Sequence, residues 1–145
     1  MSSCSVYGTG DDILSEESKL NPLSLYAESK VEDEILLLDT DALIFRLGTL
    51  HGIGDSYSRI RFDLVLNTLV MRAIYHNKIS VFGGNQYRPL LHVRDVAKTI
   101  FNSLKSDKSG IYNLHQENLI ISDLANTINE YFINLEILSS DIMYQ

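Results

Sequence analysis

Cysteine and positive charge are both scarce in this sequence, and each scarcity excludes a class of protein. Its 145 residues include a single cysteine, Cys4, so no disulfide can form within the chain, and the sequence suits a reducing cytoplasm. Lysine and arginine total 12 against 19 aspartates and glutamates, which gives a formal net charge of −7. No broad basic face is available to offset phosphate repulsion, so we expect no nucleic-acid partner.

Long apolar runs are missing as well. None approaches the ~20 residues that a membrane-spanning helix needs, so we expect no membrane segment. Residues 1–8 contain no basic segment followed by an apolar one, so we expect no signal peptide. With 45% hydrophobic and 21% charged residues, the composition is that of one globular domain with a core of its own. We therefore expect a soluble protein of the cytoplasm.

Strand and helix patterns alternate along the chain. We expect strands at 2–7, 41–47, 79–82, 90–93 and 111–114, and helices at 24–38, 62–76, 95–104 and 124–132. Alternation of this kind predicts α/β architecture with at least part of a parallel sheet.

Three finer expectations concern individual segments. A turn at 8–12 should end the first strand. The apolar stripe of the first helix should be Val31, Ile35 and Leu38, and Ser122 should be the N-cap of the last helix. The tail, 133–145, shows no closing element, which suggests a chain that is cut short.

The most informative pair is Tyr26 and Lys30. A tyrosine and a lysine four residues apart on a helix share one face. A free phenol, with a pKa near ~10, is a poor base at neutral pH, but a neighbouring ammonium stabilises the phenolate. The pair is therefore typical of a tyrosine that exchanges a proton with a sugar hydroxyl. Taken alone, a pair at this spacing occurs often by chance and favours two exposed helix residues that have no catalytic role.

Three further blocks give this pair a context. Residues 2–8 place hydroxyls at the end of a strand, where parallel sheets bind ligands. Residues 45–52 form a second strand that runs into a glycine loop, and residues 86–97 place an arginine before an extended segment and a helix.

Together with Tyr26 and Lys30, these blocks resemble the extended short-chain dehydrogenase/reductase family, and within it the NAD-dependent nucleotide-sugar epimerases and dehydratases. The resemblance covers roughly residues 2–132. It implies an α/β fold: a partial Rossmann-like parallel sheet with part of a small C-terminal substrate-binding lobe.

The resemblance also implies roles for individual residues. Ser3 matches the serine or threonine that hydrogen-bonds the sugar oxygen, and Tyr26 matches the acid/base tyrosine. Lys30 matches the lysine that holds the nicotinamide ribose and lowers the pKa of the tyrosine. Leu47 and Gly48 match the backbone that lies against the nicotinamide. These five residues are the expected catalytic and cofactor-binding set, without any metal ligand.

Substrate contacts are implied in the same way. Thr49 falls where a polar side chain touches the substrate, and Arg88 matches the arginine that binds the diphosphate, a role that suits its fork of donors. A surface ion pair is the alternative for Arg88. We interpret His51 and His92 as structural residues beside apolar strands. We interpret Cys4 as a core residue on the opposite face of its strand from Ser3, rather than a nucleophile.

One family feature is absent from the sequence. The glycine-rich turn that binds the cofactor belongs about a hundred residues before the serine motif, and Gly8-Thr9-Gly10 does not replace it, because no helix opens directly after it. We therefore expect residues 1–145 to be a single truncated domain: the C-terminal half of the Rossmann unit with part of the substrate lobe. NAD and NADP cannot be told apart, because the residue that reads the ribose lies in the missing part.

The residues at positions 4 and 5, Cys4 and Ser5, narrow the subclass of epimerase/dehydratase that the resemblance implies. Family dehydratases have an Asp-Glu pair at these two positions, and neither residue here is an acid at neutral pH. Members that epimerise next to a keto group use a cysteine where this chain has Ser5 and a histidine where it has Gly54. What remains is the Ser-Tyr-Lys set, which suffices for a 4-epimerase or for reduction of a ketone.

The resemblance therefore implies an NAD-dependent 4-epimerase of nucleotide-diphosphate sugars, or a related sugar oxidoreductase, inactive in this truncated form. The resemblance is also compatible with a homodimer. The alternative is a non-catalytic remnant that serves only to bind a partner or a nucleotide sugar.

Overall fold

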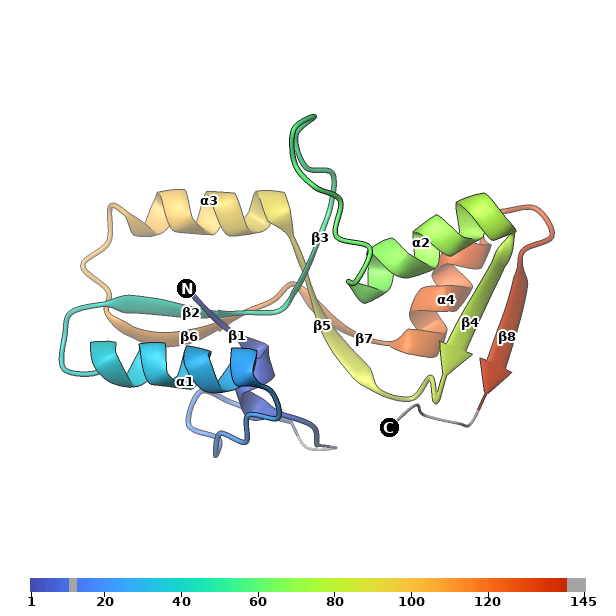
Figure 1. The fold of residues 1–145 in the computed structure, drawn as a ribbon. Coiled ribbons are helices and arrows are strands. Elements are labelled where there is room, and N and C mark those ends of the chain that lie inside the picture. Colours follow the sequence, from blue (N-terminus) through green and yellow to red (C-terminus); the bar gives the residue numbers. More distant parts are fainter. Residues whose placement is uncertain (11–12, 141–145) are drawn as a thin grey trace.

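The computed structural model describes residues 1–10 and 13–140; Asp11 and Asp12 of the expected turn, and 141–145 of the tail, lie outside the described residues. Three parallel strands form one sheet in the order β1-β2-β6, with β1 at Ser2–Ser3, β2 at Leu43–Leu47 and β6 at Gly110–Leu114. Helix α1, Leu25–Leu37, lies on one side of this sheet and helix α3, Val93–Ser103, on the other (Figure 1). The expected parallel α/β sheet is confirmed.

The first strand is shorter than expected. Strand β1 ends at Ser3, and Cys4–Tyr7 form a short 3₁₀ helix, η1. The Ser3 hydroxyl accepts a hydrogen bond from the Ser5 amide at 3.2 Å and caps this turn. A local side-chain bond of this kind competes with strand pairing, which is why the extended conformation stops here.

Helix α1 starts where the sequence predicts, but it buries a different face. The Ser24 hydroxyl caps it by accepting from the Ala27 amide at 3.2 Å. Its buried residues are Ala27 and Glu34, whereas Ile35 and Leu38 of the expected apolar stripe are 60% and 59% exposed. The expected stripe was therefore wrong at Ile35 and Leu38, whereas Val31 is half-buried. Ala27 is small enough to let the helix approach the sheet, and Glu34 finds a cation on β2.

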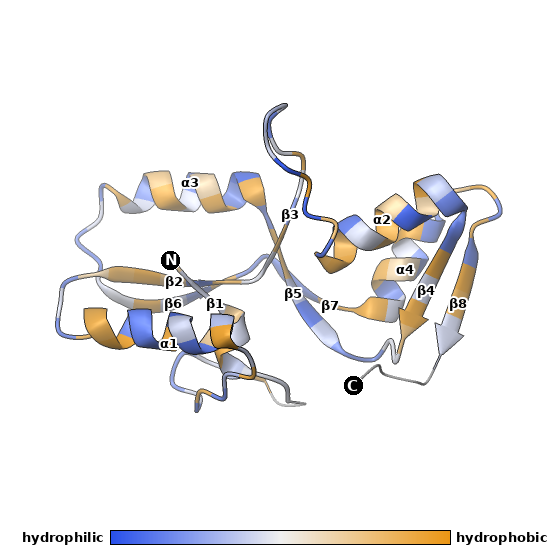
Figure 2. Cartoon of the chain, viewed as in Figure 1, coloured by the Kyte–Doolittle hydropathy of each residue, from blue (hydrophilic) through white to orange (hydrophobic). Residues whose placement is uncertain are grey.

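A second lobe holds the larger apolar core. Strands β4, Lys78–Phe82, and β8, Glu136–Ser140, pair in parallel beside helices α2, Val65–His76, and α4, Ile121–Asn129 (Figures 1 and 2). The buried apolar residues of this lobe are Leu69, Ala73, Ile79, Val81, Leu90, Ile121, Leu124, Ala125 and Ile128.

Two expectations for this lobe were wrong. The sequence of the tail, 133–145, showed no closing element, but Glu136–Ser140 of this tail form strand β8. Helix α4 begins at Ile121, before the expected N-cap Ser122, whose hydroxyl instead donates to the carbonyl of Gly84 at 3.0 Å.

A third sheet connects the β1-β2-β6 sheet to the second lobe. Strand β5, Tyr87–His92, pairs in parallel with β3, Thr49–His51, and antiparallel with β7, Glu117–Ile120. Strands β3 and β7 were not predicted, because each is too short to show a period. No helix among the described residues is long and apolar enough to cross a bilayer.

Candidate active site

Tyr26 and Lys30 lie one turn apart on α1. The Tyr26 side chain is 57% exposed, and the Lys30 ammonium donates to the Asp33 carboxylate at 2.7 Å. This hydrogen bond is the main reason that the pKa of Lys30 is raised; the charge of Asp33 and a weaker interaction with Tyr26 add to it. Lys30 is therefore firmly cationic.

Ser3 stands at the carboxyl end of β1. It pairs in register with Leu47, the last residue of β2, so the two strand ends lie side by side. The Ser3 oxygen accepts the Ser5 amide, which leaves its hydroxyl proton available to donate to a bound group. The described part of the chain shows no hydrogen bond between Ser3 and either Tyr26 or Lys30 in this state.

Gly48 links β2 to β3 at a point of close packing. Its amide donates to the carbonyl of Leu114 at 2.9 Å. A Cβ at this position would lie 2.8 Å from the carbonyl oxygen of Pro89, closer than real contacts allow. The chain therefore needs glycine where it passes from one sheet to the other.

Replacing Gly48 by alanine should consequently destabilise the fold. We expect the free energy of unfolding to fall by about 1–3 kcal/mol, as in other overpacked sites. Urea denaturation measures this directly. The matched control is Gly10→Ala, since a Cβ at Gly10 meets nothing within 4 Å. Equal stability of the two variants would contradict the close contact with Pro89.

Thr49 and Arg88 lie on neighbouring strands. Thr49 pairs with Leu90, two residues after Arg88, so the side chains of Thr49 and Arg88 lie on the same face of the β3-β5-β7 sheet. Arg88 is exposed and Thr49 is half-buried. The two expected substrate contacts thus lie on one face of this sheet.

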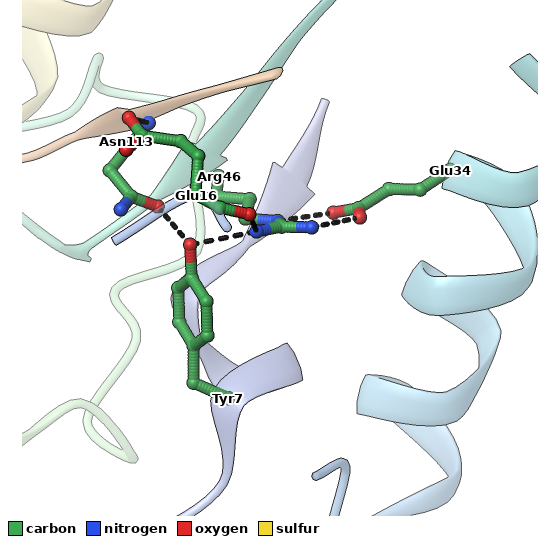
Figure 3. Close-up of polar contacts among 5 residues, drawn as sticks. All are labelled: Tyr7, Glu16, Glu34, Arg46 and Asn113. Carbon is green, nitrogen blue, oxygen red and sulfur yellow. Dashed lines mark hydrogen bonds and ion pairs between the residues drawn. The ribbon is translucent and has the colours of Figure 1, made fainter. Parts of the chain in front are cut away.

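Sequence reasoning missed a buried polar cluster centred on Arg46 (Figure 3). The Arg46 guanidinium donates to both oxygens of Glu34, at 3.0 and 2.7 Å, and the two side chains are 3% and 4% exposed. It also donates to the Tyr7 hydroxyl at 2.8 Å and to the backbone carbonyl of Glu16 at 3.1 Å. The Glu16 carboxylate in turn accepts from the amide of Asn113 at 2.7 Å.

The ionisation of this cluster follows from its contacts. The hydrogen bonds to Glu34 raise the pKa of Arg46 despite its burial. Burial by itself raises the pKa of Glu34, but the hydrogen bonds that Glu34 accepts and the positive charge of Arg46 outweigh it and leave this pKa below its ordinary value. Both groups are therefore charged at neutral pH.

A signal for this cluster was present in the sequence. Arg46 interrupts the apolar strand 43–47, and a charge buried in a strand requires a partner. Glu34 lies seven residues after Ala27, so the two share one helical face.

Tyr7 is buried, whereas Cys4 is half-buried in η1. The expectation that Cys4 is a core residue on the opposite face of a strand from Ser3 was therefore wrong, because the strand ends at Ser3. The Tyr7 hydroxyl donates to the Asn113 side chain at 2.7 Å and accepts from Arg46, whose guanidinium lies 4.9 Å from the ring centroid. The Cys4 thiol donates to the carbonyl of Arg46 at 3.4 Å. Burial raises the pKa of Cys4 to about 11, so the thiol stays protonated and is a poor nucleophile at neutral pH.

His51 and His92 contact each other rather than a reacting group. Their rings are perpendicular, with centroids 5.2 Å apart. Burial, and then the neighbouring His92, lower the pKa of His51. The Nδ1 atom of His92 accepts from the amide of Arg94 at 3.1 Å and caps α3. These contacts agree with structural roles.

Comparison with known proteins gives a consistent result. A model of the NAD dependent epimerase/dehydratase family matches residues 1–114. Among solved structures, an NAD-dependent NDP-hexosamine 5,6-dehydratase of tunicamycin biosynthesis is 24% identical, with a TM-score of 0.82 over 95% of this chain and 47% of that chain.

Two 4-epimerases match over a similar extent. The UDP-N-acetylglucosamine 4-epimerase of Methanobrevibacter ruminantium, in complex with UDP-N-acetylmuramic acid, is 22% identical, with a TM-score of 0.80 over 97% of this chain and 48% of that chain. The UDP-glucuronic acid 4-epimerase of Bacillus cereus, in complex with UDP-glucuronic acid and NAD, is 24% identical, with a TM-score of 0.76 over 96% and 47%. The chain thus spans about half the length of the solved structures that it matches.

Proposed function

Since this chain belongs to the NAD dependent epimerase/dehydratase family, we propose that it carries the catalytic residues of a nucleotide-sugar 4-epimerase or a related sugar oxidoreductase. The observation that carries this proposal is the placement of Tyr26 and Lys30 on α1, one turn apart, with α1 packed against the strand that ends in Ser3. The 145 residues then correspond to the second half of a Rossmann unit with part of a substrate lobe.

Tyr26 is the acid/base group of the proposed reaction. Its phenolate takes the proton from the sugar hydroxyl as that carbon is oxidised and returns a proton when the carbon is reduced. Lys30 lies one turn away on the same helix and is the cation that the proposal pairs with the phenol. The Ser3 hydroxyl donates to the reacting sugar oxygen.

The residues present fit the nicotinamide end of an NAD or NADP molecule. The Lys30 ammonium has three N–H donors, and Asp33 takes one of them, which leaves donors for ribose hydroxyls. Leu47 ends β2 beside Ser3, and Gly48 follows it directly, so the two residues offer an apolar side chain and backbone groups there. A bound nicotinamide supplies acceptance and return of the hydride.

The proposed substrate is a nucleotide-diphosphate sugar. Arg88 offers an exposed guanidinium fork that matches phosphate oxygens, and Thr49 lies on the same sheet face. Support comes from the two 4-epimerases above, whose complexes hold UDP-sugars. Titration of the chain with a nucleotide-diphosphate sugar, followed by NMR of Arg88, tests this contact; the Arg88 signal should shift, and its failure to move at saturation would contradict it.

A further inference from the structure

Helix α1 has few apolar contacts to fix its position. Its buried side chains are Ala27, which is small, and Glu34, which is charged, while Ile35, Leu36 and Leu38 are exposed. Figure 2 shows hydrophilic and hydrophobic residues mixed along the whole helix. The helix packs on β1 and η1, and the buried ion pair between Glu34 and Arg46 joins it to β2.

The geometry of this pair constrains the helix in two ways. Two parallel N–H···O bonds fix both the distance and the rotation of the carboxylate relative to the guanidinium. Arg46 is itself immobilised, because its remaining donors bind Tyr7 and the carbonyl of Glu16. Glu34 is thereby held in a single orientation against β2.

Both partners are directly connected to the proposed catalytic groups. Glu34 lies one turn after Lys30 and two turns after Tyr26, about 12 Å along the helix axis from Tyr26. Arg46 is followed by Leu47, which pairs with Ser3. One buried ion pair thus joins the helix of Tyr26 to the strand ends of Ser3 and Leu47.

We propose that Glu34 and Arg46 are positioning residues that set Tyr26 and Lys30 against Ser3. This inference rests on the proposed function. A buried ion pair is a weak source of net stability, because desolvation offsets most of its Coulombic gain. The role of the pair in this fold is to set the orientation of α1 relative to the sheet. Removing one oxygen acceptor lets α1 rotate while the sheet stays formed.

The test is Glu34→Gln in the 145-residue chain. The amide keeps the size of the side chain but has one oxygen to accept where the carboxylate has two. Residual dipolar couplings of backbone amides report the orientation of α1 relative to β2 and β6, without any substrate. We expect the α1 couplings to change or average, while those of α2 and α4 stay as in the wild type.

A matched control comes from a second Arg–carboxylate pair. Arg61 donates to both oxygens of Asp63, at 2.8 and 2.6 Å, but the two side chains are 59% and 61% exposed. Asp63→Asn should leave both the α1 couplings and the melting temperature unchanged, since exposed pairs contribute little. Glu34→Gln should lower the melting temperature by about 10 °C.

Two results would overturn the proposal. If Glu34→Gln melts at a lower temperature but keeps wild-type α1 couplings, the pair only stabilises the fold. If Glu34→Gln does not fold, Glu34→Asp keeps the charge and shortens the side chain by one methylene; unchanged α1 couplings in that variant count equally against positioning. Because no turnover is measured, failure of the Tyr26 chemistry would leave these couplings unaffected, so the two proposals fail separately.

Discussion

Replacing Tyr26 by phenylalanine is expected to lower kcat by about 10²- to 10⁴-fold, the usual contribution of a positioned acid/base group. The assay uses a chain in which a glycine-rich nucleotide-binding unit precedes residue 1, with a nucleotide-diphosphate sugar as substrate. The ring of Tyr26 remains and only its hydroxyl is lost, so the proton transfer is removed without a cavity. A large loss of kcat with little change in KM indicates an interaction made in the transition state.

Two comparisons make this result specific. Tyr57→Phe alters a fully exposed tyrosine on the loop after β3 and should leave both kinetic parameters unchanged. Arg88→Ala should mainly raise KM, because the diphosphate contact is made equally in the ground state and the transition state. Full kcat in Tyr26→Phe, or equal effects of Tyr26→Phe and Arg88→Ala on both parameters, would contradict the assigned roles.

The second large effect concerns the cofactor. A dinucleotide is held chiefly by a glycine-rich turn between a strand and a helix, where backbone N–H groups meet the pyrophosphate. The sequence of residues 1–145 contains no Gly-x-x-Gly-x-x-Gly motif. In the proposed site, Lys30 with Leu47 and Gly48 would contact only the nicotinamide end. We expect the 145-residue chain to bind NAD with a Kd of about 1 mM or weaker, or about −4 kcal/mol at most.

Calorimetric titration measures this affinity. Adding a glycine-rich strand-turn-helix before residue 1 should strengthen binding by orders of magnitude, whereas Lys30→Met in the longer chain should weaken it again. Tight, saturable binding of one NAD per 145-residue chain would show that the cofactor is held by a different set of residues.

Much of the fold followed from the sequence, because hydrophobic period and turn residues are local signals. Helix α1 begins at Leu25, next to the residue where the helical pattern was expected to start, and the apolar run 43–47 is a central parallel strand. The errors arose where a tertiary partner decides the outcome. Ile35 was expected in the core, yet Glu34 is buried instead, because Arg46 offers it a charge that a helix pattern cannot show.

The candidate site was predictable in a different way. Tyr26, Lys30, Ser3 and Arg88 were found from family resemblance and from the chemistry of a phenol beside an ammonium, and their roles stay predictions. The cluster around Arg46 resembles no reaction motif. Its parts come from five segments of the chain, so its geometry could be seen only once the fold had brought them together.

Inversion at one carbon of a nucleotide-diphosphate sugar tests the central claim most directly. NMR of the sugar during incubation with the longer chain and NAD distinguishes the starting sugar from its epimer at the oxidised carbon. We predict that the two epimers reach equilibrium without net consumption of NAD, and that Tyr26→Phe slows this conversion by about 10²-fold or more. Unchanged sugar in the presence of a chain that demonstrably binds both NAD and substrate would contradict the proposed function.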